Sequence, residues 1–269
     1  MPTALQAVLQ GIVQGLTEFL PVSSSAHLIL ARAFFGFDGD KFGLAFDVSL
    51  HAGTLIAVLM YFRRELGAML AALPRLFQVQ TDDDARLIWL LVVGTIPTGI
   101  VGALFSHQIE ERWRTPQVAA VTLTLGAIGL IAAERLGRQT RTERSLSFPE
   151  AFGIGCAQAL ALVPGVSRSG ATLTLALFLG LRRGEAARFI FLLSIPAILG
   201  AAAMEGPKAL AAGVGSDERT LLVLGVASSA VVSYIVVRWF IRYLGNHSLV
   251  VFAWYRFALA LAVAVWLLQ

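Results

Sequence analysis

Long apolar stretches recur along the chain and are separated by short polar loops. They lie at about 44–62, 87–105, 116–134, 186–204, 220–240 and 250–268. An α-helix needs about 20 apolar residues to cross roughly 30 Å of hydrocarbon, so each stretch predicts a transmembrane helix. A soluble core would explain one such stretch but not six. The pattern therefore predicts an all-α polytopic membrane protein, organised as one integral membrane domain over residues 1–269.

Two further apolar stretches are each interrupted by a short segment rich in proline, serine and glycine. The interruptions are Leu20–Ser25 and Pro164–Gly170. The apolar arms beside them have only about 10–17 residues, which is short for independent spans. A re-entrant hairpin, which enters and leaves by the same membrane face, fits such short arms better.

The two interrupted segments resemble each other. A shift of 144 positions lays residues 11–36 over residues 155–180 without a gap, and identical residues then coincide at Gly11/Gly155, Gln14/Gln158, Leu16/Leu160, Val22/Val166, Ser23/Ser167, Ser25/Ser169, Phe34/Phe178 and Gly36/Gly180. We therefore expect two repeats, about 1–144 and 145–269, each with a hairpin followed by three transmembrane helices. Three spans are an odd number, so the second repeat must be inverted, and the two hairpin tips should meet near the middle of the bilayer.

The charged residues predict an orientation and exclude one class of partner. Charged residues make up only 14% of the chain, against about 25% in soluble domains. With the first hairpin entering from outside, the cytoplasmic loops hold 13 arginines and the outer loops six basic residues, Lys41 among them. This asymmetry favours both termini outside the cytoplasm. Because most of the basic residues lie in short loops, we expect no nucleic-acid partner.

The first predicted tip carries polar groups where a membrane segment is normally apolar: Gln14, Glu18, Ser23, Ser24, Ser25 and His27. Gln14 and Glu18 are four residues apart and share a helix face just before Pro21. Ionisable groups at membrane depth are costly, so Glu18 and His27 predict a functional site. One of the serines has the simpler alternative of capping the helix that follows.

The second predicted tip suits an anion such as phosphate, through Gly165, Ser167, Arg168, Ser169 and Thr172. Glycine lets backbone amides approach a ligand, hydroxyls donate hydrogen bonds, and a helix that restarts here presents its positive end. Arg168 can bind two phosphate oxygens at once. Its alternative is a pairing with Glu18 alone, which is costly to bury for stability. Asp47 and His51, four apart at the start of a span, are candidates for supporting the site.

Both motifs resemble the signatures of the undecaprenyl-diphosphate phosphatase family, also called UppP or BacA. Residues 14–27 (QGLTEFLPVSSSAH) are similar to the first signature and residues 164–172 (PGVSRSGAT) to the second. The resemblance covers essentially the whole chain. It implies a bacterial inner-membrane enzyme that hydrolyses undecaprenyl diphosphate to undecaprenyl phosphate and inorganic phosphate. This reaction recycles the lipid carrier for peptidoglycan and cell-wall synthesis and is associated with bacitracin resistance.

The resemblance also implies roles for individual residues. Glu18 matches the essential acid, Ser24 the proposed nucleophile, His27 the proposed acid–base partner and Arg168 the phosphate-binding arginine. Either Ser24 or a water molecule attacks the phosphorus. The family's activity implies a divalent cation, Mg²⁺ or Ca²⁺, with Glu18 as its nearest ligand. The first acidic position of the motif, often Glu, is Gln14 here, which still offers an oxygen ligand. The hydroxyls at Ser23, Ser25, Ser167, Ser169 and Thr172, together with Gly165, are expected to bind phosphate.

Two other functions fit part of the pattern. Inverted repeats with broken helices are a transporter architecture, so a lipid or anion transporter is the main alternative. Residues Ser25-Ala-His27 loosely match the Ser-Gly-His motif of the acid-phosphatase superfamily, but the other two motifs of that superfamily have no match in suitable places. The expected partners are the polyprenyl diphosphate lipid and the bilayer, with the site opening to the periplasmic face. The sequence leaves a homodimer open.

Overall fold

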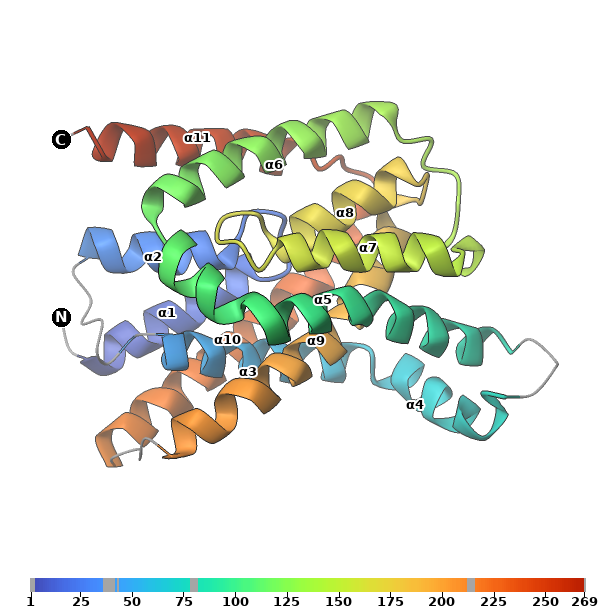
Figure 1. Ribbon diagram of the computed structural model, residues 1–269, viewed down its shortest axis with the longest axis horizontal. Coiled ribbons are helices and arrows are strands. Elements are labelled where there is room, and N and C mark those ends of the chain that lie inside the picture. Colours follow the sequence, from blue (N-terminus) through green and yellow to red (C-terminus); the bar gives the residue numbers. More distant parts are fainter. Residues whose placement is uncertain (1–2, 36–41, 43, 78–81, 212–215, 269) are drawn as a thin grey trace.

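The structure is a computed structural model that describes residues 3–35, 42, 44–77, 82–211 and 216–268. These residues form helices and no strand, which confirms the predicted all-α class. The helices, shown in Figure 1, are α1 (Thr3–Thr17), α2 (Ser24–Phe35), α3 (Leu44–Tyr61), α4 (Arg63–Ala72), α5 (Asp83–Trp113), α6 (Pro116–Leu136), α7 (Phe148–Leu160), α8 (Arg168–Phe178), α9 (Arg183–Ala211), α10 (Ser216–Leu244) and α11 (Val250–Trp266). Short 3₁₀ turns lie at Leu73–Arg75 and Glu143–Ser145.

Every predicted span is helical. Four helices of the described part are long and apolar enough to cross a membrane, in segments Asp83–Ile109, Pro116–Leu136, Arg183–Met204 and Glu218–Leu244. The two remaining spans correspond to the shorter apolar helices Phe46–Tyr61 and Val250–Trp266. Together these helices confirm a polytopic membrane protein.

Helix α4 is an element that the sequence analysis assigned to a cytoplasmic loop. Its first residues, Arg63 and Arg64, are exposed, whereas Leu66 and Met69 pack against the main apolar core. The helix therefore presents one polar and one apolar side. Its ten residues are too few for the span-length criterion that identified the other helices.

The two predicted interruptions are the tips of two helical hairpins. Helices α1 and α2 have 15 and 12 residues, and α7 and α8 have 13 and 11. At about 1.5 Å per residue none of the four can cross 30 Å of hydrocarbon alone. In Figure 1 the α1–α2 hairpin (blue) and the α7–α8 hairpin (yellow-green) open toward opposite ends of the molecule, and their tips lie together near its middle.

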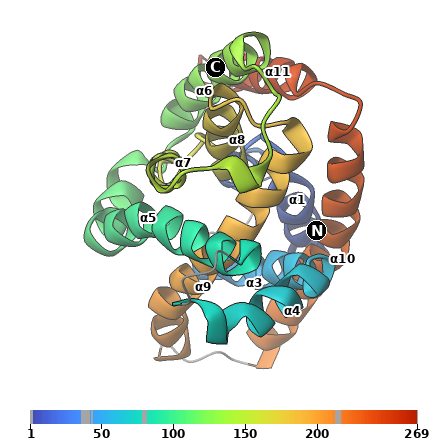
Figure 2. The same cartoon turned by 90° about the vertical axis from the view of Figure 1, so that its right-hand side faces the viewer.

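The hairpins pack against long helices from the other half of the chain. Helix α1 packs on α10, and α7 packs on α5. Both contacts depend on glycine, because a Cβ added at Gly11 would overlap the backbone of Gly225, and one added at Gly155 would overlap the backbone of Gly94. Figure 2 shows α6 and α11 together on one side of the bundle and α3, α4 and α9 on the other. The inverted relation between the two repeats itself stays a prediction, and Gly36 and Lys41 lie outside the described residues.

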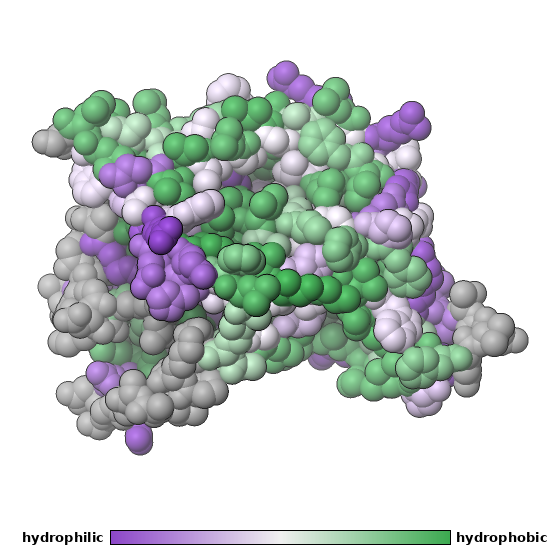
Figure 3. Space-filling view, viewed as in Figure 1, coloured by the Kyte–Doolittle hydropathy of each residue, from purple (hydrophilic) through white to green (hydrophobic). Residues whose placement is uncertain are grey.

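The outer surface of the bundle is apolar in its middle. Large apolar side chains of α6 and α10 point outward and are more than half exposed, among them Val121, Leu125, Ile128, Val231 and Ile235. Figure 3 shows green, apolar atoms over the centre of one face and purple, polar residues mainly toward the two ends. Such an exposed apolar belt is expected where lipid rather than water is the solvent.

Candidate active site

The two tips have the same local structure. Ser23 and Ser167, which coincide in the repeat alignment, have φ angles of 73° and 72°. Each hydroxyl lies 3.2 Å from the hydroxyl of the serine two residues later. Each also accepts a backbone N–H from the first turn of the following helix, at 3.4 Å and 3.0 Å. These serines therefore cap α2 and α8, which was the simpler alternative for one of them, and both also line the central pocket.

The tips contact each other directly. The hydroxyl of Ser169 donates to the carbonyl oxygen of Leu20 at 2.8 Å, and the backbone N–H of Gly165 donates to Ser25 Oγ at 3.4 Å. Gly165 has a φ of 87°, a conformation that glycine adopts without strain. The sequence prediction that the two tips meet is thus confirmed by the contacts between them.

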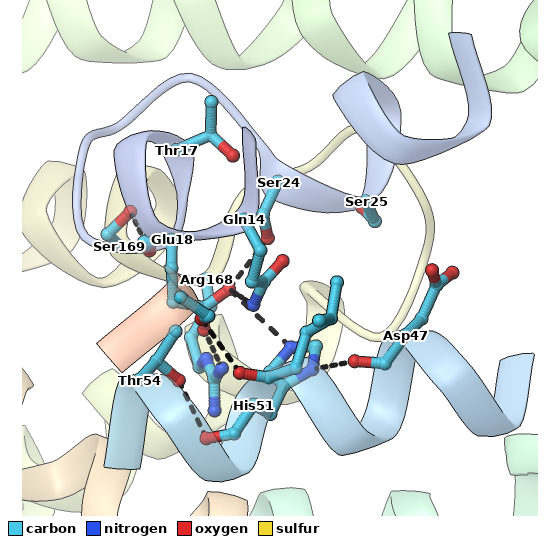
Figure 4. A network of polar contacts seen from close by, with 12 residues as sticks. Gln14, Thr17, Glu18, Ser24, Ser25, Asp47, His51, Thr54, Arg168 and Ser169 are labelled. Carbon is cyan, nitrogen blue, oxygen red and sulfur yellow. Dashed lines mark hydrogen bonds and ion pairs between the residues drawn. The ribbon is translucent and has the colours of Figure 1, made fainter. Parts of the chain in front are cut away.

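Glu18 joins the functional groups of both tips (Figure 4). Its carboxylate is buried; Oε1 forms an ion pair with Arg168 of the second tip. Its Oε2 accepts hydrogen bonds from Ser24 Oγ at 2.7 Å and from Gln14 Nε2 at 2.9 Å. The pairing of Glu18 with Arg168, which was the alternative to phosphate binding, is therefore present, and it brings Arg168 to the same carboxylate that holds Ser24.

His51 faces this carboxylate from helix α3. Its Nε2 lies 3.5 Å from Glu18 Oε2, and its Nδ1 donates to the carbonyl oxygen of Asp47 at 2.8 Å. The ring lines the pocket. The Asp47 carboxylate points elsewhere, because Arg32 holds both of its oxygens at 2.7 Å and Arg114 pairs with it too. Asp47 therefore supports His51 through its backbone, whereas His51 itself reaches the pocket.

His27 is turned away from the pocket. Its Nδ1 donates to the carbonyl oxygen of Ser23 at 2.7 Å, and its Nε2 lies 2.7 Å from the hydroxyl of Tyr255 on α11. The His27 and Tyr255 rings are stacked, with centroids 5.6 Å apart. The structure therefore brings Glu18, Ser24 and Arg168 together but does not bring His27 to them, and the acid–base role of His27 stays a prediction.

The remaining predicted phosphate-binding residues divide into two groups. Ser25 joins Ser23 and Ser167 in lining the pocket. Thr172 instead donates to the carbonyl oxygen of Arg168 at 2.7 Å within α8, while Ser169 and Gly165 make the contacts between the tips. These last three residues hold the backbone of the tips, and their polar atoms are already engaged.

The pocket has a polar and an apolar side. Its volume is about 220 Å³. Arg168, His51 and the tip serines form its polar lining, while small or apolar side chains of α3, the second tip and α9 form its apolar lining, namely Val48, Ala161, Leu162, Ala197, Ile198, Ala201 and Ala202. A ligand with a charged head and an apolar body matches such a pocket.

Two polar residues of the pocket were missed by the sequence analysis, Thr98 and Gln158. Gln158 Nε2 donates to Thr98 Oγ1 at 3.1 Å, and the Thr98 hydroxyl donates to the carbonyl oxygen of Gly155 at 3.2 Å. The repeat alignment held the signal for one of them, because Gln158 is the counterpart of Gln14. Thr98 lies in a long apolar helix and has no motif around it.

The oxygen atoms around Glu18 fit a hard divalent cation only in part. The buried Oε1 of Gln14 has no hydrogen-bond partner, and together with the Glu18 carboxylate it offers the oxygen ligands that Mg²⁺ and Ca²⁺ prefer. Among the described residues, no cluster of three or more His, Cys, Asp or Glu side chains is placed to hold a metal. A cation at this place would therefore need further oxygen ligands from the substrate.

Comparison with known proteins gives a consistent answer. Residues 7–262 match the family described as Bacitracin resistance protein BacA. The chain is 49% identical over 267 residues to an undecaprenyl-diphosphatase of Rubrobacter xylanophilus, covering 98% of each chain. It is 44% identical to the protein of that name from Moorella thermoacetica, covering 99% of each, and 42% identical to that from Trichlorobacter lovleyi, covering 96% and 95%. With a match over nearly its whole length and a two-tip site built from both family motifs, the chain belongs to the BacA family.

Proposed function

We propose that this chain hydrolyses undecaprenyl diphosphate to undecaprenyl phosphate and inorganic phosphate. The observation that carries the proposal is the junction at Glu18, which holds Ser24 of one tip and Arg168 of the other beside a pocket with an apolar wall. The names of the relatives and the family match support the same reaction.

Arg168 and the start of α8 form the phosphate-binding part of the site. Arg168 is the first residue of α8, after the cap Ser167, so free backbone N–H groups accompany its guanidinium. A helix N-terminus and a guanidinium both favour an anion. Stabilising the charge on the transferring phosphoryl group is the main task of an enzyme in this type of reaction. Arg168 would exchange part of its contact with Glu18 for phosphate oxygens when the substrate binds.

Ser24 is placed to act as the nucleophile. Its hydroxyl already donates to Glu18 Oε2 at 2.7 Å, so the carboxylate can take the proton as the Ser24 oxygen attacks the terminal phosphorus. The new bond joins Ser24 Oγ to this phosphorus, and the bond to the bridging oxygen breaks to release undecaprenyl phosphate. Water then hydrolyses the phosphoserine to inorganic phosphate. Direct attack by water, held by the same carboxylate, is the alternative.

His51 is better placed than His27 to exchange protons with this carboxylate. In the neutral ring, donation from Nδ1 to the Asp47 carbonyl leaves Nε2 free to accept a proton, and Nε2 points toward Glu18. His27 does not line the pocket, and both of its ring nitrogens are engaged, Nδ1 with the Ser23 carbonyl and Nε2 with the Tyr255 hydroxyl. We therefore assign proton exchange in the second half of the reaction to His51.

Glu18 and Gln14 would hold a divalent cation, Mg²⁺ or Ca²⁺, when the diphosphate provides the remaining oxygens. Such a cation supplies positive charge beside the diphosphate. If this is correct, Gln14→Leu should raise the Mg²⁺ concentration needed for half-maximal activity, and it should also weaken Mg²⁺ binding measured with a non-hydrolysable diphosphate. Unchanged Mg²⁺ binding in this variant would contradict the assignment.

The prenyl chain has an apolar path between α5 and α9. A groove of about 430 Å³ runs along this seam, lined by α4, α5 and α9. It adjoins the pocket on both helices. On α9, Pro196 lines the groove and Ala197 lines the pocket; on α5, Gly99 lines the groove and Thr98 lines the pocket. A second apolar groove, of about 540 Å³, lies between α5 and α7, where the Thr98–Gln158 hydrogen bond ties the two helices together. We therefore place the first prenyl units in the α5–α9 groove.

The orientation is part of the proposal as well. A bacterial inner-membrane location with the site opening to the periplasmic side is supported by the arginine-rich loops that the sequence analysis assigns to the cytoplasm. In Figure 1, α1 begins and α11 ends at the same end of the molecule, which suits termini on one side of the membrane. This orientation is tested in intact cells by labelling a single cysteine introduced beside either terminus of the chain.

The decisive experiment is phosphate release from undecaprenyl diphosphate by the purified protein in detergent. Wild type should release phosphate, while Arg168→Ala and Glu18→Ala should be inactive although folded. The transporter alternative requires a different result: lipid movement in vesicles that survives Ser24→Ala, with no phosphate released by wild type. That pair of results would overturn the proposed function.

A further inference from the structure

Arg256 is a fully buried cation that the reaction described above does not use. It lies in the middle of α11 with 0% of its surface exposed, and it does not line the pocket. A charged side chain inside a membrane protein is costly and is usually retained for a function. Within the described part of the chain, all of its hydrogen bonds go to backbone carbonyl oxygens and none to a carboxylate.

These carbonyls belong to three separate segments. Arg256 Nη1 donates to Pro21 of the first tip at 3.2 Å. Its Nη2 donates to Gly165 and Val166 of the second tip at 3.2 Å and 3.1 Å. The same guanidinium also reaches α6, where it donates to the carbonyls of residues 122 and 123 at 3.0 Å and 3.1 Å. One side chain thus ties both tips to each other and to a transmembrane helix.

The surrounding sequence leaves room for this guanidinium. A Cβ added at Gly126 of α6 would overlap Arg256 Nη2, and one added at Gly170 of α8 would lie 2.7 Å from Nη1. Tip carbonyls at this depth need hydrogen-bond donors, because they lie outside regular helix and hydrocarbon offers none. The planar guanidinium, with its five donors, can satisfy several of them at once. Lysine has three donors on a single nitrogen and cannot span the same acceptors.

We propose that Arg256 is a positioning residue, which fixes the distance between the two half-sites by binding the backbone of both tips. The carbonyl at Pro21 lies three residues before Ser24, and the carbonyl at Val166 lies two residues before Arg168. A shift of either tip would therefore separate the nucleophile from the phosphate-binding group. This inference rests on the proposed function, because the reaction is its readout.

The first test compares Arg256→Met and Arg256→Lys with wild type. A misplacement of about 1 Å in an active site can lower the rate about 100-fold. Both variants should therefore lose roughly 100-fold in kcat, while KM changes by less than about threefold because the prenyl chain still binds. Arg256→Lys retains the charge but not the bridge. Wild-type kcat in Arg256→Lys would overturn the proposal and would assign the effect to charge alone.

A matched control separates positioning from stability. Arg183→Met removes an arginine that pairs with Glu134, away from the tips. It should lower the melting temperature in detergent without changing kcat per folded molecule. Arg256→Ala should in addition regain activity when guanidinium is added, because the ion can bind the vacated carbonyls. Failure of guanidinium to restore activity in folded Arg256→Ala would count against the proposal.

A second pair of variants keeps the test open if the Arg256 variants do not fold. Gly126→Ala retains Arg256 but pushes its guanidinium, whereas Gly129→Ala, on the same helix, meets only Thr174 Cγ2 at an ordinary 3.5 Å. Gly126→Ala should lower kcat at least about tenfold, and Gly129→Ala should stay within about twofold of wild type. Equal activity of the two would overturn the inference. Absence of activity in wild type would instead overturn the proposed function, so the two failures are distinguishable.

Discussion

Glu18 accepts hydrogen bonds from Ser24 and Gln14, pairs with Arg168 and lies near His51, so one carboxylate concentrates most of the polar contacts of the site. Burying an ion pair costs several kcal/mol of desolvation per ion, and its attraction offsets that cost only with good geometry. At the residue scale, the Glu18 carboxylate is therefore charged and hydrogen-bonded, and a bound diphosphate can take over part of the contact that Arg168 makes with it.

Ser24→Ala tests the covalent step. The change removes the oxygen that would attack the phosphorus and leaves the Glu18–Arg168 pair in place. We expect kcat to fall by about 1,000-fold or more, since nucleophile and general base act as a unit. Rapid quench with substrate labelled in the terminal phosphate should trap label on wild-type protein and not on the variant. A loss of only about tenfold, without trapped label, would instead indicate direct attack by water.

The two histidines provide a second comparison. His51→Gln removes the imidazole that faces Glu18, so we expect a loss of roughly 100-fold in kcat, as for a group that transfers protons. His27→Gln should lose less than about tenfold, because the contact with Tyr255 lies outside the pocket. Steady-state phosphate release by both purified variants decides the matter. The reverse order of effects would support the acid–base role that the family resemblance implies for His27.

At the scale of elements, the site depends on short helices that end inside the bundle. Both tips begin their second helix with a capping serine and are held by contacts with long helices. Close approach requires glycine on the hairpins, at Gly11 against the backbone of Gly225 and at Gly155 against the backbone of Gly94. The hairpins are therefore set by backbone contact rather than by flexible side chains, which suits a site that must keep two half-sites aligned.

Filling the α5–α9 groove tests the path of the prenyl chain. Gly99 lines the groove, and a Cβ added there would meet no heavy atom within 4 Å. Gly99→Leu should raise KM for undecaprenyl diphosphate about tenfold by blocking the groove, and it should leave competitive inhibition by inorganic diphosphate, which has no prenyl chain, unchanged. Gly102→Leu is the control, since its site is equally open but outside the groove. Equal KM values in the two variants would contradict the proposed path.

At the scale of the whole molecule, the bundle has an apolar middle and charged ends. Exposed apolar side chains of α6 and α10 form part of the surface that meets lipid. The arginines at the end that carries the α6–α7 turn form ion pairs, such as Arg141 with Glu150 and Arg188 with Glu143. That turn joins the two predicted repeats, so its ion pairs connect the halves outside the hydrocarbon.

The pH dependence of stability should report on this turn. Burial raises the pKa of Glu143 from 4.5 to about 7, although Arg188 opposes the shift. The folded state therefore holds a proton that the unfolded state loses near pH 4.5, and this contribution to stability disappears as the pH rises through 7. The melting temperature in detergent should fall by several degrees between pH 5 and pH 8. Glu143→Gln should flatten this slope, and an unchanged slope would contradict the role of Glu143.

The sequence by itself determined the membrane spans and the two interrupted segments, and it predicted Glu18, Ser24 and Arg168 as site residues, which the structure brings together. These features are local: apolar length predicts a span, proline ends a helix, and a capping serine starts the next. Even the contact between the tips followed from the relation between residues 11–36 and 155–180.

Only the tertiary structure decided which side chains complete the site. His27 and His51 are both polar residues in apolar segments, and the sequence alone favoured His27. Packing of α11 places Tyr255 against His27, across 228 residues of chain, and packing of α3 turns His51 toward Glu18. The role of Arg256 likewise emerges only when three distant backbone segments converge on it. Such partners depend on how each helix is rotated about its axis relative to its neighbours, and neither apolar length nor a short motif determines that rotation.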